Sequence, residues 1–443
     1  MSAAVSNAEG QRLLILAGKL GYQTRSFDEA ARKLGVEVLF ATDRCERLDD
    51  PWGDRAIAVH FERPQEAAGA ILEALPALTG GSVDAVLALG DRPTVAAAHV
   101  ARGLGLPGNH PLAVAACRSK LRQREVFQAA GLRVPWFRAL PLRPLPDPAL
   151  AGIEFPCVVK PLGLSASQGV IRANNREEFR AAVVRITRLV ESPELQARRE
   201  EGLEFVLAEG YIPGKEVAVE GLLSAGRLRV LAIFDKPGTP EGPFFEETIY
   251  VTPSRLDEAQ QREIERAAED AVRVLGLEDG PVHAEFRVND EGVWPLEVAP
   301  RPIGGLCSRA LRFGPEEAGE MILLEELLVR HALELPGADW PRERAASGVM
   351  MIPVPSSGVL QKVEGDEEAR ATPGITELHI TARLQDAITA WPEGSSYLGF
   401  LFARGETPGA VEGALREAHA KLRFTISPRL PVVHAAADRP PQH

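Results

Sequence analysis

The sequence predicts a multidomain protein that combines an α/β part with α+β parts. Near the N-terminus, short apolar runs such as 12–17 and 83–89 alternate with helical stretches, which is typical of an open parallel sheet of Rossmann type. Further along, the segment 215–234 alternates apolar and polar residues around a glycine turn, as two antiparallel strands do. From about residue 346, short strands precede one late helix, 409–423, so a compact C-terminal α+β domain is expected.

Length and composition are those of an ordinary globular protein. The 443 residues are enough for three or four domains, and 45% are hydrophobic and 25% charged. The net charge of −12 argues against a nucleic-acid partner, because phosphates favour a basic face. No apolar run reaches the length of a membrane span and the N-terminus lacks a signal-peptide pattern, so no membrane partner and a cytoplasmic location are expected. The four cysteines lack metal-site spacing and are expected to be free thiols.

The middle of the chain mixes helices and strands. One helix is predicted over 113–131, and Gly131 ends it. An apolar strand at 155–160, a helix at 176–190 and a strand at 204–209 follow. This mixture is typical of an α+β lobe.

The stretch 283–305 carries the clearest chemical signal. Two alternating runs flank a glycine turn, which predicts an antiparallel hairpin with one carboxylate on each strand, Glu285 and Glu297. Paired carboxylates on a rigid hairpin suit Mg²⁺, and Arg301 just beyond can grip a phosphoryl or carboxylate oxygen. His283 is expected to point away from the Glu285 face as a structural histidine. Taken alone, the pattern fits a surface hairpin with solvated glutamates equally well.

Two lysines and a loop of small residues suit a nucleoside triphosphate. Lys160 ends an apolar strand, so it projects a cation from rigid structure. The loop 163–169 follows it, and its amides and hydroxyls can close over phosphates. Lys120, at the opening of a helical region, would supply a second cation.

The segment EGYIPGKEV, residues 209–217, suits a nucleoside. Tyr211 and Ile212 offer an extended backbone and an apolar wall for a flat base. Glu216 offers a carboxylate for the hydroxyls of a ribose. Each feature also has a non-functional explanation, as a solvated charge or an ordinary loop.

The order of these features resembles the ATP-grasp superfamily across roughly residues 110–310. The order is lysine, helix, lysine, Gly/Ser loop, E-x-Y-I-x-G-x-E, a glutamate pair and P-R-x-x-G-G. The resemblance implies an N-terminal open parallel domain, a two-lobed ATP-grasp core clasping ATP, and a C-terminal α+β domain similar to that of the biotin carboxylases. The expected boundaries are 1–112 for the N-terminal domain, 113–207 for the small lobe with a linker helix, 208–340 for the large lobe with the metal site, and 341–443 for the C-terminal domain.

The resemblance also assigns roles to residues. It implies ATP and Mg²⁺ as cofactors, with Mn²⁺ as an alternative ion, and Glu285 and Glu297 would hold the metal. Ala299 stands where many members carry an asparagine, so one metal ligand is missing or supplied elsewhere. The residues implied to contact ATP are Lys120, Lys160, Ser165, Ser167, Gln168, Gly169, Glu209, Tyr211, Ile212 and Glu216.

Within the superfamily, the stretch 233–253 resembles the L-amino-acid ligase branch, which includes dipeptide and carnosine-type synthases. There Lys236 would lie near phosphate, Glu247 near the metal or the substrate amine, and Arg301 would face the amino-acid carboxylate. The implied activity is an ATP-dependent carboxylate–amine ligase that forms an amide, of dipeptide type, through an acyl phosphate and releases ADP and phosphate. The implied partners are small-molecule carboxylates and amines, expected to be amino acids, and a homodimer is a family-level expectation.

Two alternatives stay open. A carboxylase or a formate-dependent formyl-transfer ligase of purine-synthesis type also carries E-V-x-P-R-P. Against it, the biotin carboxylase signature N-x-R-x-Q-V-E-H after the second glutamate is absent, and the chain has APRPIGGLCSR there. A nucleotide-binding regulatory protein with a degenerate centre is the other alternative, although both lysines, both glutamates and the arginine are present.

Overall fold

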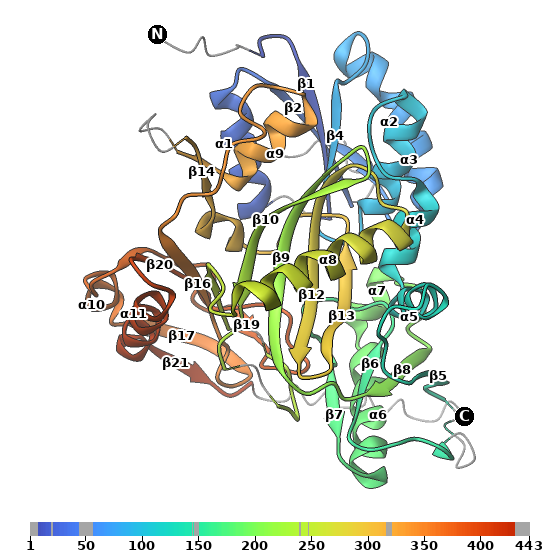
Figure 1. Cartoon of the computed structure of the whole chain (residues 1–443), viewed down its shortest axis with the longest axis vertical. Coiled ribbons are helices and arrows are strands. Elements are labelled where there is room, and N and C mark those ends of the chain that lie inside the picture. The colour runs from blue at the N-terminus through green and yellow to red at the C-terminus, as the bar shows by residue number, and fades with distance from the viewer. Residues whose placement is uncertain are drawn as a thin grey trace, which may run out of the picture.

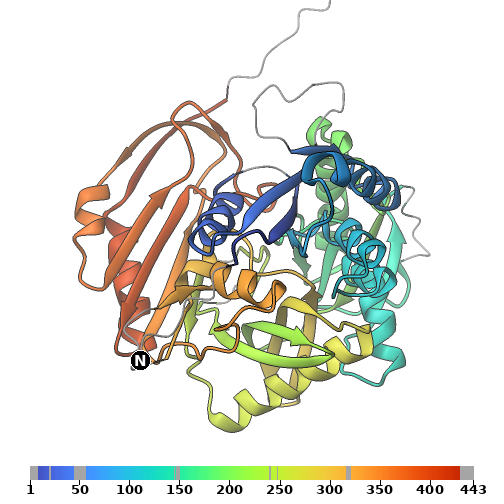
Figure 2. The ribbon, with the colours of Figure 1, turned by 90° about the horizontal axis from the view of Figure 1, so that it is seen from above.

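The fold is known from a computed structural model, in which the N-terminal part lies at the top, the small lobe at the lower right and the C-terminal helices at the lower left (Figure 1). Seen from above, the N-terminal sheet lies between the C-terminal part and the small lobe (Figure 2). The structure describes residues 8–18, 21–43, 56–143, 145, 150–238, 241–246, 248–315 and 321–429.

The N-terminal part is a parallel sheet, as predicted, with strand order β3-β2-β1-β4. Leu13 and Ile15 of β1 pack into one core cluster, and Leu14 and Leu16 pack into another on the opposite face. This burial on both faces explains the unbroken apolar run of that strand. The edge strand β3 was not predicted, since it is only three residues long. The elements are β1 (Arg12–Ala17), α1 (Tyr22–Lys33), β2 (Glu37–Asp43), β3 (Ile57–Val59), α2 (Pro64–Thr79), β4 (Ala85–Leu89) and α3 (Thr94–Leu104).

The prediction of one helix over 113–131 is wrong, because two helices, α4 (Pro111–Arg118) and α5 (Lys120–Ala129), occupy that stretch. Ser119 separates them in an extended conformation (φ −105°, ψ 111°), and its hydroxyl accepts a hydrogen bond from the Arg122 amide. A serine in this role caps the start of a helix and interrupts the preceding one. The break places Lys120 in the first turn of α5.

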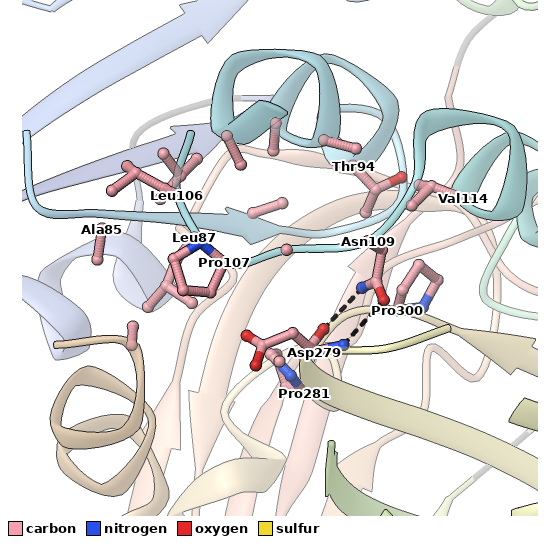
Figure 3. A pocket seen from close by; sticks show the side chains of 18 of the residues that line it. Ala85, Leu87, Thr94, Leu106, Pro107, Asn109, Val114, Asp279, Pro281 and Pro300 are labelled. Atoms are coloured by element: carbon pink, nitrogen blue, oxygen red, sulfur yellow. Dashed lines mark hydrogen bonds between the residues drawn. The ribbon is translucent and has the colours of Figure 1, made fainter. Parts of the chain in front are cut away.

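A small cavity of about 70 Å³ lies at the seam between the N-terminal sheet and the large lobe (Figure 3). Asn109 joins the two sides of this seam. Its side-chain amide donates to the carbonyl oxygen of Asp279 at 2.7 Å, and its carbonyl accepts from the amide of Glu278 at 2.7 Å. The N-terminal part is therefore held to the large lobe by polar contacts of the half-buried Asn109 as well as by apolar packing.

The small lobe is a four-stranded sheet of order β5-β8-β6-β7, covered by α6. The helix α6 has the predicted bounds, and Asn175 caps it by accepting from two backbone amides. Between α6 and β8, where the sequence predicts no helix, the chain forms the short helix α7. The elements are β5 (Phe137–Pro141), β6 (Cys157–Pro161), β7 (Ile171–Ala173), α6 (Arg176–Val190), α7 (Pro193–Arg198) and β8 (Phe205–Gly210).

The large lobe is built on an eight-stranded sheet of order β13-β12-β9-β10-β11-β16-β20-β18. The predicted hairpin is confirmed as β12 (Gly280–Asn289) and β13 (Gly292–Ala299). The helix α8 (Glu258–Leu275) crosses one face of this sheet and buries Ile264 and Val272 against it (Figure 1). The next strands of this sheet are β9 (Lys215–Ser224), β10 (Arg227–Asp235) and β11 (Ile249–Thr252).

The C-terminal part contains the expected short strands and late helix, but three of its strands extend the large-lobe sheet. β16 pairs with β11 along four residues, so the sheet continues across the expected boundary at 341, which stays a prediction. No helix within the described ranges is long and apolar enough to cross a membrane. The other elements are β14 (Arg312–Phe313), β15 (Ile322–Leu323), α9 (Leu324–Ala332), β16 (Ala346–Ile352), β17 (Gly358–Glu364), α10 (Asp366–Arg370), β18 (Ile375–Ile380), β19 (Ala387–Ile388), β20 (Gly399–Gly405), α11 (Pro408–Lys421) and β21 (Arg423–Ser427).

Candidate active site

A cavity of about 760 Å³ lies between the two lobes and is also lined by the N-terminal and C-terminal parts. Most of the predicted site residues meet in it, although they come from distant parts of the chain. Gln168, Gly169 and Lys236 are not among its lining residues, and Glu247 lies outside the described residues. The predicted residues that line it are Lys120, Lys160, Ser165, Ser167, Glu209, Tyr211, Ile212, Glu216, Glu285, Glu297 and Arg301.

The two hairpin glutamates are direct cross-strand partners. Glu285 on β12 is opposite Glu297 on β13, so both side chains lie on the face that lines the cavity. Lys236, at the end of β10, lies 2.8 Å from Glu285 Oε1 and 3.0 Å from Glu216 Oε1. Burial alone would raise the pKa of Glu285, but Lys236 and His283 override it and hold that pKa well below its ordinary range. Glu285 is therefore ionised in this site.

The expectation that His283 points away from Glu285 is wrong. Residues two apart on a strand share a face, so His283 lines the same cavity, with Nε2 3.4 Å from Glu285 Oε1. Its Nδ1 is hydrogen-bonded to Glu220 on the neighbouring strand β9. Burial would lower the pKa of His283, but the charge of Glu220 and the hydrogen bonds of Glu220 and Glu285 raise it to about 9. The register of β9 against β12, which places Glu220 opposite His283, was needed to find this pair.

Lys160 ends β6 inside a buried ion triad. Its Nζ lies 2.5 Å from Glu209 Oε1, and Arg124 Nε lies 2.9 Å from Glu209 Oε2. Burial lowers the pKa of Lys160 despite the opposing charge of Glu209. For Glu209, burial is outweighed by Arg124 and Lys160, which lower the carboxyl pKa to about 2. Arg124, from α5, was missed because nothing local to its sequence points to a site.

The loop 163–169 is held from two sides. Lys120 Nζ donates to the carbonyl oxygen of Leu164, which ties α5 to the loop. Gln168 Nε2 donates to the Glu393 carbonyl at 2.6 Å, and the Gly169 amide donates to the Pro392 carbonyl at 2.9 Å. Gln168 and Gly169 therefore face the C-terminal part, and their predicted contacts with ATP stay predictions.

The expected nucleoside end is organised by an arginine that sequence reasoning missed. Arg287 Nη1 donates to the Ile212 carbonyl at 2.7 Å, and its Nε donates to Glu216 Oε2 at 3.0 Å. Tyr211 stacks on Phe245, with ring centroids 6.4 Å apart. Arg287 is the residue two after Glu285 on β12, so strand alternation gives the signal that would have found it.

Arg301 is fixed by a carboxylate from the N-terminal part. Its Nε lies 2.7 Å from Asp91 Oδ1 and its Nη2 lies 3.2 Å from Asp91 Oδ2. Burial would lower the pKa of Arg301, but Asp91 outweighs it and raises that pKa above its ordinary value. The Asp91 pKa is lowered because the charge of Arg301 outweighs the burial of the carboxyl group.

Part of the cavity lining is an apolar and aromatic wall. Tyr22 of α1 and Phe400 of β20 meet edge to face, with centroids 6.0 Å apart, and Tyr397 lies 6.3 Å from Phe400. Met351 and Cys307 complete this wall. Uncharged side chains here favour an apolar group over a charged one, because a buried charge needs a partner.

Three family models match the chain in the order of its parts. They are the ATP-grasp N-terminal domain over residues 28–108, the ATP-grasp domain over 153–310, and the L-amino acid ligase C-terminal domain 2 over 350–427. A D-alanine–D-alanine ligase of Geotalea uraniireducens is 32% identical over 51% of this chain and 69% of its own length. Carnosine synthase 1 of Gallus gallus is 29% identical over 78% of this chain and 38% of its own length.

Among solved structures, the L-amino acid ligase from Bacillus licheniformis matches with a TM-score of 0.75 and 26% identity, over 95% of this chain and 99% of that one. The chain belongs to the ATP-grasp superfamily, and its C-terminal residues 350–427 and its overall structure are similar to those of L-amino acid ligases. It spans 38% to 65% of the length of the first three curated relatives it matches. A phosphoribosylglycinamide synthetase from Anaerococcus prevotii shares the fold alone, with a TM-score of 0.65 at 16% identity.

Proposed function

We propose that the protein is an ATP-dependent ligase that joins the carboxylate of one amino acid to the amine of another and releases ADP and phosphate. The observation that carries the proposal is that Glu285, Glu297, Lys160 and Arg301 line one cavity between two lobes. This set supplies ligands for a hard cation and two separate positive charges, which phosphoryl transfer requires. The similarity to carnosine synthase 1 and to an alanine–anticapsin ligase of Bacillus amyloliquefaciens supports amino acids as the substrates.

The residues present fit ATP and Mg²⁺. Glu297 has no ion pair with any residue in the described ranges, and Glu285 is ionised, so two carboxylates are available to the metal. Mg²⁺ held there would neutralise the charge on transferring phosphate, and Mn²⁺ accepts the same oxygen ligands. In this proposal Lys120, Lys160 and Lys236 bind phosphates together with the loop residues Ser165, Ser167, Gln168 and Gly169, Glu216 binds ribose, and Glu209, Tyr211 and Ile212 bind adenine.

The first chemical step forms an acyl phosphate. An oxygen of the amino-acid carboxylate attacks the γ-phosphorus of ATP, and the bond to the β-phosphate oxygen breaks to release ADP. Arg301 compensates the charge on the acyl phosphate, because its guanidinium presents a fork of donors to oxygen pairs. The loop 163–169 would keep water from this reactive intermediate.

The second step forms the amide. The amine of the other amino acid attacks the acyl carbon, phosphate leaves, and the nitrogen gives up a proton, for which Glu247 is the candidate acceptor. The wall formed by Tyr22, Met351, Tyr397 and Phe400 would receive an uncharged side chain of one substrate. In this proposal the reaction takes place in the cytoplasm. The enzyme is proposed to be a homodimer, as the family resemblance implies.

The test is a coupled ADP-release assay with Mg-ATP and all pairs of amino acids, with single amino acids, bicarbonate and formate as further arms. We expect release only with a pair, and a new amide by mass spectrometry. A carboxylate labelled with ¹⁸O should transfer one label to the released phosphate if the acyl phosphate forms. Release with bicarbonate or formate would instead support the purine-synthesis type of ligase, and ATP binding without turnover would support a regulatory protein.

A further inference from the structure

The strand β4 delivers two adjacent charged side chains to the edge of the active site. β4 ends at Leu89, and Gly90 then adopts a left-handed conformation (φ +82°), so the chain turns sharply before Asp91 and Arg92. The carbonyl of Asp91 accepts from the hydroxyl of Thr94 at 2.7 Å, which fixes the turn ahead of α3. The two side chains then contact different lobes.

Asp91 occupies one edge of the Arg301 guanidinium and leaves the other edge available. A guanidinium has five N–H donors. Two of them, on Nε and Nη2, face the Asp91 oxygens, and Nη1 donates to the Pro302 carbonyl at 3.0 Å. In the described part of the chain, one donor therefore remains on each terminal nitrogen, and together they form a fork for the two oxygens of a carboxylate or phosphoryl group.

Arg92 contacts the small lobe. Its Nη1 lies 2.5 Å from Glu200 Oε1, and Arg118 Nη2 holds the other oxygen of Glu200 at 3.0 Å. The segment that carries Glu200 lies against the loop 163–169, because a Cβ added at Gly163 would come within 2.7 Å of the Glu201 carbonyl oxygen. Adjacent residues thus connect the expected phosphate-binding loop with the arginine of the substrate site.

We propose that Asp91 is a positioning residue that aligns Arg301 with the substrate, and that Arg92 couples this alignment to the docking of loop 163–169 through Glu200. The inference rests on the proposed function. A free arginine side chain has several rotatable bonds, so a carboxylate that holds Nε and Nη2 restricts the direction of the fork. Correct placement of a charged group matters strongly for phosphoryl transfer.

The first experiment compares Asp91→Asn with Asp84→Asn, which changes an aspartate at the opposite end of β4 that accepts from the Arg12 amide at 2.7 Å. Rates are divided by the concentration of sites that bind Mg-ADP, so a folding defect cancels. For Asp91→Asn we expect kcat for amide formation to fall by roughly 10- to 100-fold, with the KM for ATP unchanged within about twofold. The control should keep both constants. A kcat for Asp91→Asn equal to that of the wild type would overturn the proposal.

A second measurement does not depend on turnover. In protein labelled with ¹⁵N-arginine, the Nε–H signal of Arg301 is identified by its loss in Arg301→Lys. We expect this signal to shift in Asp91→Asn and to stay in place in Asp84→Asn, because Asp91 accepts from that N–H. An unmoved signal would overturn the positioning role. If the wild type makes no amide from any pair of amino acids, the proposed function fails while this signal still tests Asp91.

The coupling through Arg92 is tested by Glu200→Gln and by the double variant Asp91→Asn/Glu200→Gln. If Glu200 and Asp91 both act through Arg301, the loss caused by Asp91→Asn already includes the loss caused by Glu200→Gln. We then expect the kcat of the double variant to be lower than that of Asp91→Asn by no more than about twofold. If the loss of kcat in the double variant equals the product of the losses in the two single variants, the small lobe does not act through Asp91. That result would remove the coupling and leave the alignment role to the other two measurements.

Discussion

Glu285 and Glu297 lie directly opposite each other on β12 and β13, so the hairpin holds two carboxylates on one face. Like charges at opposed positions of a sheet are destabilising. Lys236 pairs with Glu285 at 2.8 Å, but Glu297 has no ion pair in the part of the chain that the structure describes. In the metal-free hairpin the two carboxylates therefore repel each other, and a bound cation would relieve this repulsion.

The first prediction concerns Glu297→Gln. Without Mg²⁺, the free energy of unfolding should rise by about 0.2–1 kcal/mol, because one of two opposed charges is removed. Amide formation should fall by a factor on the order of 10² or more, because the change removes a metal ligand that helps to stabilise transferring phosphate. Denaturant unfolding with and without Mg-ADP, together with ADP release, measures both effects.

Glu291→Gln is the matched control, because Glu291 is exposed in the turn of the same hairpin. It should change neither activity nor the stabilisation by Mg-ADP. A Glu297→Gln variant that keeps full activity, or that loses stability in the absence of the metal, would contradict the assignment of Glu297.

The second prediction is a pH dependence that comes from Glu209. Its carboxyl pKa is about 2 in the folded protein against an ordinary value of 4.5, so the folded state holds the ionised form. This stability is present above pH 4.5 and is lost as the pH falls toward 2. The two values correspond to a contribution on the order of 3 kcal/mol.

We therefore expect Glu209→Gln to be less stable than the wild type by about 3 kcal/mol or more at pH 6, because Lys160 and Arg124 lose their buried partner. The difference should shrink as the pH falls to 3. Denaturant unfolding across this range measures it, and Glu204→Gln, at an exposed position before β8, is the control. A difference that stays constant between pH 6 and pH 3 would refute the role of Glu209.

The local features of the fold could be predicted from the sequence. The apolar run of β1 and the alternating runs at 283–288 and 293–298 are local patterns, and the structure confirms the strand and the hairpin that they predict. The break at Ser119 was missed because a serine cap competes with helix continuation over a single residue. His283 was misplaced although period-two alternation, correctly applied, places it on the face of Glu285.

The partners of the site residues could not be predicted. Asp91 and Arg301 are 210 positions apart, and Arg124 and Glu209 are 85 apart. Such pairs are decided by how the sheets pack, and no local pattern marks them. Sequence order indicated which residues gather in the cavity, but the charged partners of Glu209, Glu285 and Arg301 came only from the structure.

The last prediction concerns the loop that is expected to cover the phosphates. Gly163→Ala places a Cβ 2.7 Å from the backbone oxygen of Glu201, so the loop or the segment behind it must move. We expect the Kd for Mg-ATP to rise about tenfold, or about 1.4 kcal/mol, while the protein stays folded. Calorimetric titration measures this, and Gly69→Ala in α2, where a Cβ has no atom within 4 Å, is the control. An alanine in that helix should leave the Kd unchanged and raise the free energy of unfolding by roughly 0.5–1 kcal/mol. If Gly163→Ala binds Mg-ATP as the wild type does, the loop is not held against residues 199–202 when it binds phosphate.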